Sequence, residues 1–380
     1  MRNSFYQSLT NYFRSLDWTL ILSAISVSIL GLLTMNSFLS NNGLFYRQFT
    51  WLCFSIFVMF GLSFVDFRFL RLTPVVVFIF LAMSVVLLSL FIIGSTIKGS
   101  QSWIDFGSFS FQPSDPAKLV LIIVLAKYFT KRHVEIAHIR HIVVPGLYAF
   151  ILFALVFLQP DFGSAIIIFG VWFGLMMVTG ISRKHLMVLL TIGIVTVVGL
   201  WFFVFAEYQK LRILTFINPL SDLQGAGYNA YQSTVAVGSG RLLGKGIGYG
   251  TQSKLSFLPE YETDFIFAAF AEEWGFIGVG ILLILFAIII WRIMANAKVG
   301  ATNFEILYCV GLALIFMTHF VIHVGMNIGL LPVTGITLPL MSYGGSHLLT
   351  EFAGIGILLG MRRYKRDTHK EAIGNEFLGI

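Results

Sequence analysis

Long apolar runs, each bounded by charged residues, dominate the pattern along this chain. The first run has about 20 residues, which is the length that an α-helix needs to cross the bilayer core. Ten such runs lie near 19–38, 49–65, 73–94, 117–129, 143–158, 164–180, 186–206, 265–291, 305–325 and 346–361. The pattern predicts an all-α polytopic membrane protein with about ten transmembrane helices in a single domain, 1–380.

Several of these runs, notably 117–129 and 143–158, are shorter than the roughly 17 residues of an upright span. Short spans need neighbouring helices, local thinning of the bilayer or extension into a loop. The run at 19–38 is longer than the core of a signal peptide, and no clear cleavage site of small residues follows it. We therefore expect an uncleaved anchor there.

The composition agrees with a membrane protein. Of the 380 residues, 57% are hydrophobic and 11% are charged, and the mean hydropathy is +0.86. Because globular proteins carry about 25% charged residues, soluble enzymes, disordered chains and fibrous proteins are excluded. The net charge of +7 is interpreted as loop charge, so we expect no nucleic-acid partner. Cys53 and Cys309 lie in apolar runs without paired or metal-ligand spacing, which favours neither a disulfide nor a zinc site.

Loop charges predict the orientation, because Lys and Arg concentrate on the cytoplasmic side. An even number of spans places both termini on one side. With the termini inside, the inner segments carry about twice as many Lys and Arg residues as the outer segments. We expect both termini in the cytoplasm, with 362–380 as a cytoplasmic tail and 207–264 as a large extracytoplasmic loop between spans seven and eight.

Three outer segments contain most of the residues that could carry chemistry. Segment 95–116 mixes aromatic and acidic residues and is too apolar for a plain solvated connector. Loop 207–264 begins with EYQKLRILTFINPL, whose apolar residues recur at the spacing of an interfacial helix, and continues rich in glycine. Segment 326–345 has no charge but contains LLPVTGITLPLMSYGGS. We therefore expect the site on the outer face.

Asp264, in LPEYETDF at the end of the long loop, is the strongest catalytic candidate. In one interpretation Thr263 or Asp264 caps the following helix, a contribution of ~1 kcal/mol. In the other, Asp264 is a general base. A helix N-terminus favours its ionised form, whereas like-charge repulsion from Glu262 opposes it. A carboxylate between these two influences suits a general base.

The string FQPSDPAK supplies a second group. Asp115 followed by Pro116 is typical of an N-cap with proline at the first helical position, which is the alternative to a binding role. Lys118 lies one turn into a predicted span, where a cation is costly and is usually paired or functional. The alternative for Lys118 is a side chain that snorkels to the interface.

Three further residues are candidates for substrate binding. Asp161, in LQPDFGS, lies in a short outer turn and either stabilises that turn or contributes to an acidic site. Arg212, in EYQKLR, either binds a pyrophosphate or anchors a lipid headgroup. Ser342 offers a hydroxyl in the uncharged segment 326–345.

Three acids, Glu272, Glu273 and Glu351, lie within apolar runs. An unpaired charge there costs at least ~2.5 kcal/mol, so we expect these acids to be paired, protonated or exposed to a polar cavity. His323 and Asn327 are more typical of hydrogen bonds between helices than of ligands. A strand followed by GxGxxG, a Walker loop and HExxH are all missing from the sequence, which gives no support for cytosolic nucleotide chemistry.

Seven strings occur in order over nearly the whole chain: FQPSDPAK, LQPDFGS, EYQKLR, GAGYNAYQS, AVGSGRLLGKGIGYGTQSKLSFLPE, TDFIFAAFAEEWG and GLLPVTGITLPLMSYGGS. Together they resemble the SEDS family of bacterial membrane proteins (shape, elongation, division, sporulation), which includes RodA, FtsW and SpoVE. TQSKLSFLPE is more similar to the RodA branch, and GITLPLMSYGG is slightly more similar to the FtsW branch. We favour the RodA branch.

This resemblance implies a peptidoglycan glycosyltransferase that polymerises lipid II into β-1,4 glycan strands for cell elongation and shape. It places the reaction at the outer face of the bacterial cytoplasmic membrane. It also implies a class B penicillin-binding protein as the transpeptidase partner, beside other membrane proteins of the elongation complex. A divalent cation, Mg²⁺ or Mn²⁺, is a candidate cofactor that the sequence does not show.

The resemblance also assigns residues. Asp264 matches the family's essential loop carboxylate, and Asp115, Lys118 and Asp161 match charged positions of its central cavity. Glu272 matches the first acid of the family's EE-x-G string.

Three positions depart from the family pattern. Asp115 stands where Glu is usual, Glu262 where His is usual, and His347 where a small residue is common.

Two other classes of function fit the same residues. Intramembrane charges, short spans and polar outer loops also suit a flippase for lipid II or another lipid transporter. A scaffold that only recruits the penicillin-binding protein is the third alternative. Transport predicts leaflet exchange by the purified protein, a scaffold predicts dispensable loop carboxylates, and the enzyme predicts a glycan product.

Overall fold

The computed structural model describes residues 12–37, 42–97, 100–107, 109–130, 140–203, 207–218, 226–255, 257–300 and 302–378. Each of the ten predicted spans coincides with one helix. These helices are α2 (Trp18–Asn36), α3 (Asn42–Ser63), α4 (Thr73–Ile93), α5 (Ser114–Thr130), α6 (Arg140–Leu158), α7 (Phe162–Thr179), α8 (Arg183–Phe203), α12 (Ile266–Val299), α13 (Asn303–Asn327) and α14 (Gly345–Leu378). The prediction of an all-α polytopic fold is confirmed in its main feature.

Eight helices in the described part of the chain are long and apolar enough to cross a membrane. The other two of the ten are α5, with 17 residues, and α14. A span count of ten therefore stays a prediction. The predicted C-terminal tail begins inside α14, whose backbone is helical as far as Leu378.

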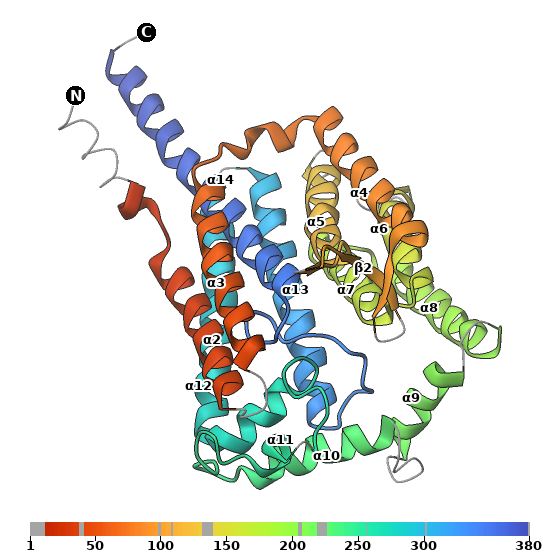
Figure 1. The fold of residues 1–380 in the computed structure, drawn as a ribbon. Coiled ribbons are helices and arrows are strands. Elements are labelled where there is room, and N and C mark those ends of the chain that lie inside the picture. Colours follow the sequence, from red (N-terminus) through yellow and green to blue (C-terminus); the bar gives the residue numbers. More distant parts are fainter. Residues whose placement is uncertain are drawn as a thin grey trace.

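The helices form a bundle in which α2, α3, α12 and α14 pack on one side, and α4 to α8 lie on the other (Figure 1). Helix α13 packs against members of both groups, namely α5, α7, α12 and α14. Helix α2 begins and α14 ends at one end of the molecule, and α10 and α11 lie at the opposite end (Figure 1). The start of α2 and the end of α14 thus lie at the end of the bundle opposite α10 and α11.

A small antiparallel sheet lies between α4 and α5, where the sequence led us to expect only an apolar loop. Its strands are β1 (Ser95–Ile97), β2 (Ser100–Asp105) and β3 (Ser110–Phe111), in the order β1-β2-β3. Trp103 pairs with Ser95, and Ile104 pairs with Phe111. The sheet is an addition to the predicted all-α fold. A short 3₁₀-helix, η1 (Phe67–Arg71), precedes α4.

The described parts of the long loop contain three helices, α9 (Glu207–Ile217), α10 (Ala226–Ser239) and α11 (Thr251–Lys254). The predicted helix at the start of the loop is α9. The glycine-rich stretch that follows α10 packs tightly on a kink in α12 at Gly275, whose φ is 64°. A Cβ atom on Gly244 would lie 2.0 Å from the carbonyl oxygen of Glu273, so this approach requires glycine.

A buried carboxylate joins three helices at the end of the bundle where α2 begins. Asp17, the N-cap of α2, is 2% exposed and accepts hydrogen bonds from Arg292 Nη2 at 2.8 Å and Arg362 Nη1 at 2.6 Å. Burial raises the pKa of Asp17, but the hydrogen bonds from Arg292, Asn296 and the Leu20 N–H, with the charge of Arg362, outweigh it. The pKa is therefore lowered. The ionised form of Asp17 stabilises the packing of α2, α12 and α14.

Candidate functional site

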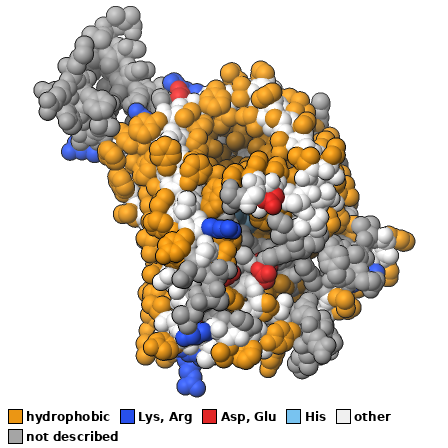
Figure 2. Space-filling model, in the orientation of Figure 1, with side chains coloured by type: hydrophobic (Ala, Val, Ile, Leu, Met, Phe, Trp, Pro, Cys, Tyr) orange, Lys and Arg blue, Asp and Glu red, His pale blue; other side chains and the backbone are white. Residues whose placement is uncertain are grey.

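A cavity of about 980 Å³ opens between the sheet and the helices. It is lined by α3, by residues of the sheet, by the turn between α6 and α7, by Thr263 and Asp264, and by parts of the segment 334–347. The face drawn in Figure 2 is largely hydrophobic, with a few basic and acidic side chains near its middle. The cavity brings together all three outer segments that the sequence singled out.

Asp264 lines this cavity and is half-buried. Its carboxylate lies beside Gly335, where a Cβ atom would be 3.6 Å from Oδ2. Helix α12 begins at Ile266 and Phe265 takes the N-cap position, one residue after Asp264. Asp264 thus contributes its carboxylate to the cavity from the residue before the N-cap.

Asn327, at the end of α13, provides the acceptor that the start of α12 lacks. Its Oδ1 accepts from the Ala268 N–H at 3.2 Å, and its Nδ2 donates to the carbonyl oxygens of Asp264 at 3.0 Å and His323 at 2.8 Å. Asn327 is completely buried. The expected role of Asn327 in interhelical hydrogen bonds is confirmed, and these bonds fix the peptide that carries the Asp264 side chain.

Asp161 also lines the cavity and is the N-cap of α7. Its Oδ1 accepts from the Ser164 N–H at 3.0 Å. Its Oδ2 accepts from Gln112 Nε2 at 2.8 Å and from the Ser114 hydroxyl at 3.1 Å. Asp161 therefore stabilises its turn, as the first interpretation held, and also presents a negative charge to the cavity.

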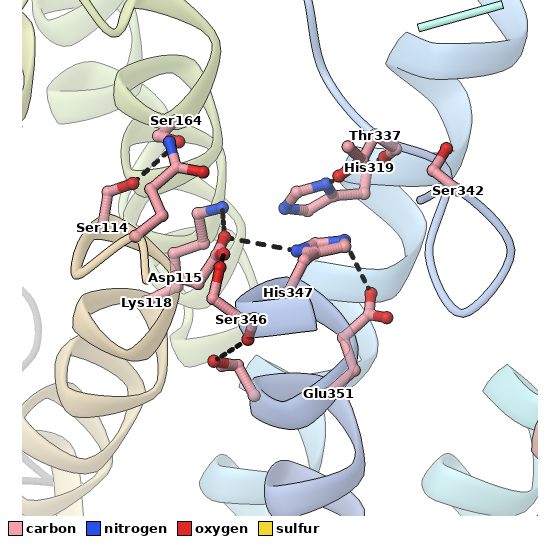
Figure 3. A network of polar contacts seen from close by, with 12 residues as sticks. Ser114, Asp115, Lys118, Ser164, His319, Thr337, Ser342, Ser346, His347 and Glu351 are labelled. Carbon is pink, nitrogen blue, oxygen red and sulfur yellow. Dashed lines mark hydrogen bonds and ion pairs between the residues drawn. The ribbon is translucent and has the colours of Figure 1, made fainter. Parts of the chain in front are cut away.

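Asp115 and Lys118 are not among the residues that line the cavity, and they contact each other on α5 (Figure 3). Each is 3% exposed, and Lys118 Nζ donates to Asp115 Oδ1 at 3.0 Å. Lys118 is thus paired and does not snorkel. The N-cap interpretation of Asp115 is wrong, because α5 begins at Ser114 and the Asp115 carboxylate also accepts from the Ser346 hydroxyl of α14 at 3.0 Å.

Ser342 is buried and does not line the cavity. Its hydroxyl donates to the Thr263 carbonyl oxygen at 2.8 Å and accepts from the Leu338 N–H at 2.8 Å. The first bond holds the segment before α14 against the residue that precedes Asp264, and the second fixes the turn within that segment. This placement supports positioning of Asp264 rather than contact with a substrate.

Glu272 also lies outside the cavity lining, completely buried. Its Oε1 accepts from Lys245 Nζ at 2.7 Å and from the Thr251 N–H at 2.9 Å, so it fixes the loop before α11. Glu273, next to it, accepts from the Ser37 hydroxyl at 2.6 Å. Glu272 is therefore paired with a cation, which indicates a structural role in place of substrate binding, whereas the hydrogen bonds that Glu273 accepts come from neutral groups.

One cation of the site, Arg47 on α3, was not predicted from the sequence as a site residue. Arg47 lines the cavity and is exposed, whereas Arg212 belongs to α9 with its side chain outside the described residues. Among the described residues, no hydrogen bond or ion pair engages the Arg47 guanidinium. From the sequence, Arg47 was interpreted only as a loop charge. Its position between Tyr46 and Gln48, in the string YRQFTW, is the sequence feature that could have indicated a binding role.

The helix turn that carries Arg47 is fixed on both sides. Gln48 is 3% exposed; its Nε2 donates to the Ser342 carbonyl oxygen at 3.0 Å, and its Oε1 accepts from the Gly344 N–H at 3.2 Å. The Trp51 ring packs so closely on Gly345 that a Cβ atom there would lie 2.3 Å from the ring. The helix turn of Arg47 therefore packs on the same segment, residues 342–345, that is hydrogen-bonded to the residue before Asp264.

A metal site is not evident among the described residues. Within them, no group of three or more His, Cys, Asp or Glu side chains is arranged to hold a metal ion. A divalent cation, Mg²⁺ or Mn²⁺, therefore stays a prediction from the family resemblance.

Apolar helices around a polar cavity, with buried charges paired between helices, define a polytopic integral membrane protein with its site near one end of the bundle. The chain belongs to the FtsW/RodA/SpoVE family, whose model, described as "Cell cycle protein", matches residues 10–367. The resemblance stated from the sequence strings is confirmed.

Relatives and solved structures agree with this assignment. Peptidoglycan glycosyltransferase MrdB of Escherichia coli (strain K12) is 38% identical over 273 residues, which cover 72% of this chain and 74% of that protein. The rod shape determining protein RodA of Thermus thermophilus superimposes with a TM-score of 0.68 at 30% identity, covering 91% of this chain and 96% of that one. A chain of a peptidoglycan synthase complex superimposes with a TM-score of 0.78 at 30% identity, covering 91% of this chain and 97% of that one.

Proposed function

We propose that this protein is a peptidoglycan glycosyltransferase that polymerises lipid II at the cavity, with Asp264 as the general base. The observation that carries the proposal is the placement of Asp264, from the long loop, in one cavity with Arg47 and the aromatic side chains of α3 and the sheet. The names of the family's relatives, among them a peptidoglycan glycosyltransferase, support the reaction class.

The reaction forms a bond between the sugar 4-hydroxyl oxygen of the acceptor and the anomeric carbon of the donor. The bond from that carbon to the undecaprenyl pyrophosphate breaks, and the configuration changes from α to β. A hydroxyl is too weak an acid to attack unaided, and a positioned base contributes roughly 10²–10⁴-fold. The hydroxyl proton passes to the Asp264 carboxylate, while the electron pair of the broken bond leaves with the pyrophosphate.

The leaving pyrophosphate develops negative charge that a cation must stabilise. Lys118 is unsuited to this role, because it is buried, paired with Asp115 and absent from the cavity wall. Arg47 takes its place, since a guanidinium can form two parallel hydrogen bonds to a phosphate group. Arg212 remains a second candidate on α9.

The proposed setting is the bacterial cytoplasmic membrane, with the cavity on the outer side and both termini in the cytoplasm. The excess of Lys and Arg in the segments on the side of the termini supports this orientation. A class B penicillin-binding protein is the proposed partner, and the similarity to a chain from a peptidoglycan synthase complex supports an assembly of this kind.

Polymerisation of purified lipid II by the purified protein, with and without a class B partner, tests the proposal. The enzyme predicts glycan chains in at least the sample with partner. Leaflet exchange of lipid II in vesicles, measured on the same preparation, identifies the transporter. Leaflet exchange of lipid II without any glycan product, with the partner and a divalent cation present, would overturn the proposal that the protein is a glycosyltransferase.

A further inference from the structure

His347, at the start of α14, lies between two carboxylates (Figure 3). Its Nδ1 is 3.2 Å from Asp115 Oδ1 on α5, and its Nε2 is 3.0 Å from Glu351 Oε1 on α14. A neutral imidazole has one N–H and one lone pair, so one of these contacts would set a lone pair against a carboxylate oxygen. Only the protonated ring presents an N–H to both acids.

Protonation of His347 also balances the local charge. We call Asp115, Lys118, His347 and Glu351 the buried quartet, because none of the four is more than 6% exposed. The quartet then contains two carboxylates, one ammonium and one imidazolium, and its net charge is zero. Loss of the His347 proton would leave one uncompensated negative charge in a buried position, which is strongly unfavourable.

The two histidines of α13 near His347 add no charge to the quartet, and the charged groups Arg47, Asp161 and Asp264 share the cavity lining with His347. The ring of His319, on α13, lies 4.8 Å away between centroids, and its Nδ1 is 3.3 Å from the Thr337 carbonyl oxygen, which requires an N–H there. His323 likewise has its Nδ1 2.7 Å from the Ile336 carbonyl oxygen. Both rings satisfy these bonds in the neutral form. Within the described residues, the proton on His347 therefore determines the net charge of the quartet.

The quartet is connected to the peptide beside Asp264. Glu351 uses its second oxygen, Oε2, to accept from the Leu340 N–H at 2.7 Å. Two residues further on, the Ser342 hydroxyl donates to the Thr263 carbonyl oxygen at 2.8 Å. Of the four members of the quartet, only His347 itself also lines the cavity. The charge state of His347 is thus coupled to the cavity lining and to the segment before α14 that is hydrogen-bonded to Thr263.

We propose that protonated His347 is a positioning residue, which holds α5 against α14 and, through Glu351 and the segment before α14, orients Asp264. This inference rests on the proposed function, because it concerns the same site. The competent form is the protonated one, so raising the pH removes it, and both stability and polymerisation fall on the alkaline side. The base Asp264 acts in the opposite direction, because it must be ionised and fails on the acidic side.

Two variants test the charge balance. His347→Gln removes the charge and leaves the quartet with one excess negative charge. His347→Gln combined with Glu351→Gln returns the sum to zero. We expect the single variant to lose stability and to polymerise roughly tenfold to a hundredfold more slowly, which is the loss caused by a misplacement of ~1 Å. The double variant should recover most of the stability and part of the rate, without the alkaline decline.

Thermal stability and lipid II polymerisation are measured on the same preparations from mildly acidic to alkaline pH. His323→Gln, which replaces a neutral buried imidazole, is the control and should keep the alkaline decline of the wild type. A double variant no more stable than the single one, or a single variant that keeps the wild-type alkaline decline, would overturn the proposal. A wild type that makes no glycan overturns the proposed function instead, while the stability profiles still test the quartet.

Discussion

Asn327→Leu tests whether the position of Asp264 depends on α13. The change removes the hydrogen bonds to Ala268 N, Asp264 O and His323 O, and a longer fourth bond in which Asn327 Oδ1 accepts from the Ser233 hydroxyl at 3.3 Å. At about 1 kcal/mol for each bond, the free energy of unfolding should fall by about 3–4 kcal/mol. Because the Asp264 peptide loses its anchor, polymerisation should fall by up to roughly 10²-fold even well below the unfolding temperature.

Thr318→Val on the same helix is the matched control, because it removes one hydrogen bond, from Thr318 to Leu314 O at 2.7 Å, that does not reach Asp264. Stability is read from thermal unfolding in detergent, and activity from the initial rate of glycan formation from lipid II. An Asn327→Leu protein that is destabilised but polymerises at the wild-type rate would refute the reasoning, since Asn327 would then support the fold without orienting the base.

Arg47→Gln should raise the KM for lipid II by roughly tenfold or more, because a hydrogen bond to a charged group contributes about 1.5–3 kcal/mol; an unchanged KM would exclude Arg47 from phosphate binding. Gly345→Ala should destabilise the protein by about 1–3 kcal/mol, because the added Cβ would lie 2.3 Å from the Trp51 ring. Gly344→Ala meets only an ordinary contact at 3.5 Å, and equal melting temperatures for the two alanine variants would count against this packing. Because the pKa of Asp17 is lowered in the folded state, its ionised form stabilises the protein fully above the unfolded-state pKa, and this stabilisation is lost as the pH falls through the folded-state pKa. Asp17→Asn should therefore show a smaller loss of the free energy of unfolding over this acidic range than the wild type.

The hydrophobic pattern was sufficient to predict the helices, because a continuous apolar run has few alternatives to a buried or lipid-facing helix. It could not predict the sheet between α4 and α5, whose strands have only two to six residues and too little periodicity. Helix α10 was missed for a related reason, since its glycine and tyrosine content resembles that of a loop.

The candidate site was predictable only in part. The position of Asp264 before an apolar run indicated its place at the end of the loop, and the cost of a buried cation indicated that Lys118 is paired. The contact of His347 with Asp115 could not be predicted, because it joins helices 232 positions apart, and the sequence does not specify their relative rotation. Arg47 was missed because a cation at the end of an apolar run is also typical of a side chain that snorkels to the membrane interface.

The most direct test of the central claim compares Asp264→Asn with Asp105→Asn in lipid II polymerisation by the purified protein and its class B partner. Both carboxylates line the cavity, but Asp105 lies on the exposed sheet, where its Oδ1 accepts from the Gly107 N–H at 2.9 Å. The account predicts that Asp105→Asn still makes glycan and that folded Asp264→Asn makes none above background. Glycan formation by Asp264→Asn at the wild-type rate would contradict the assignment of Asp264 as the base.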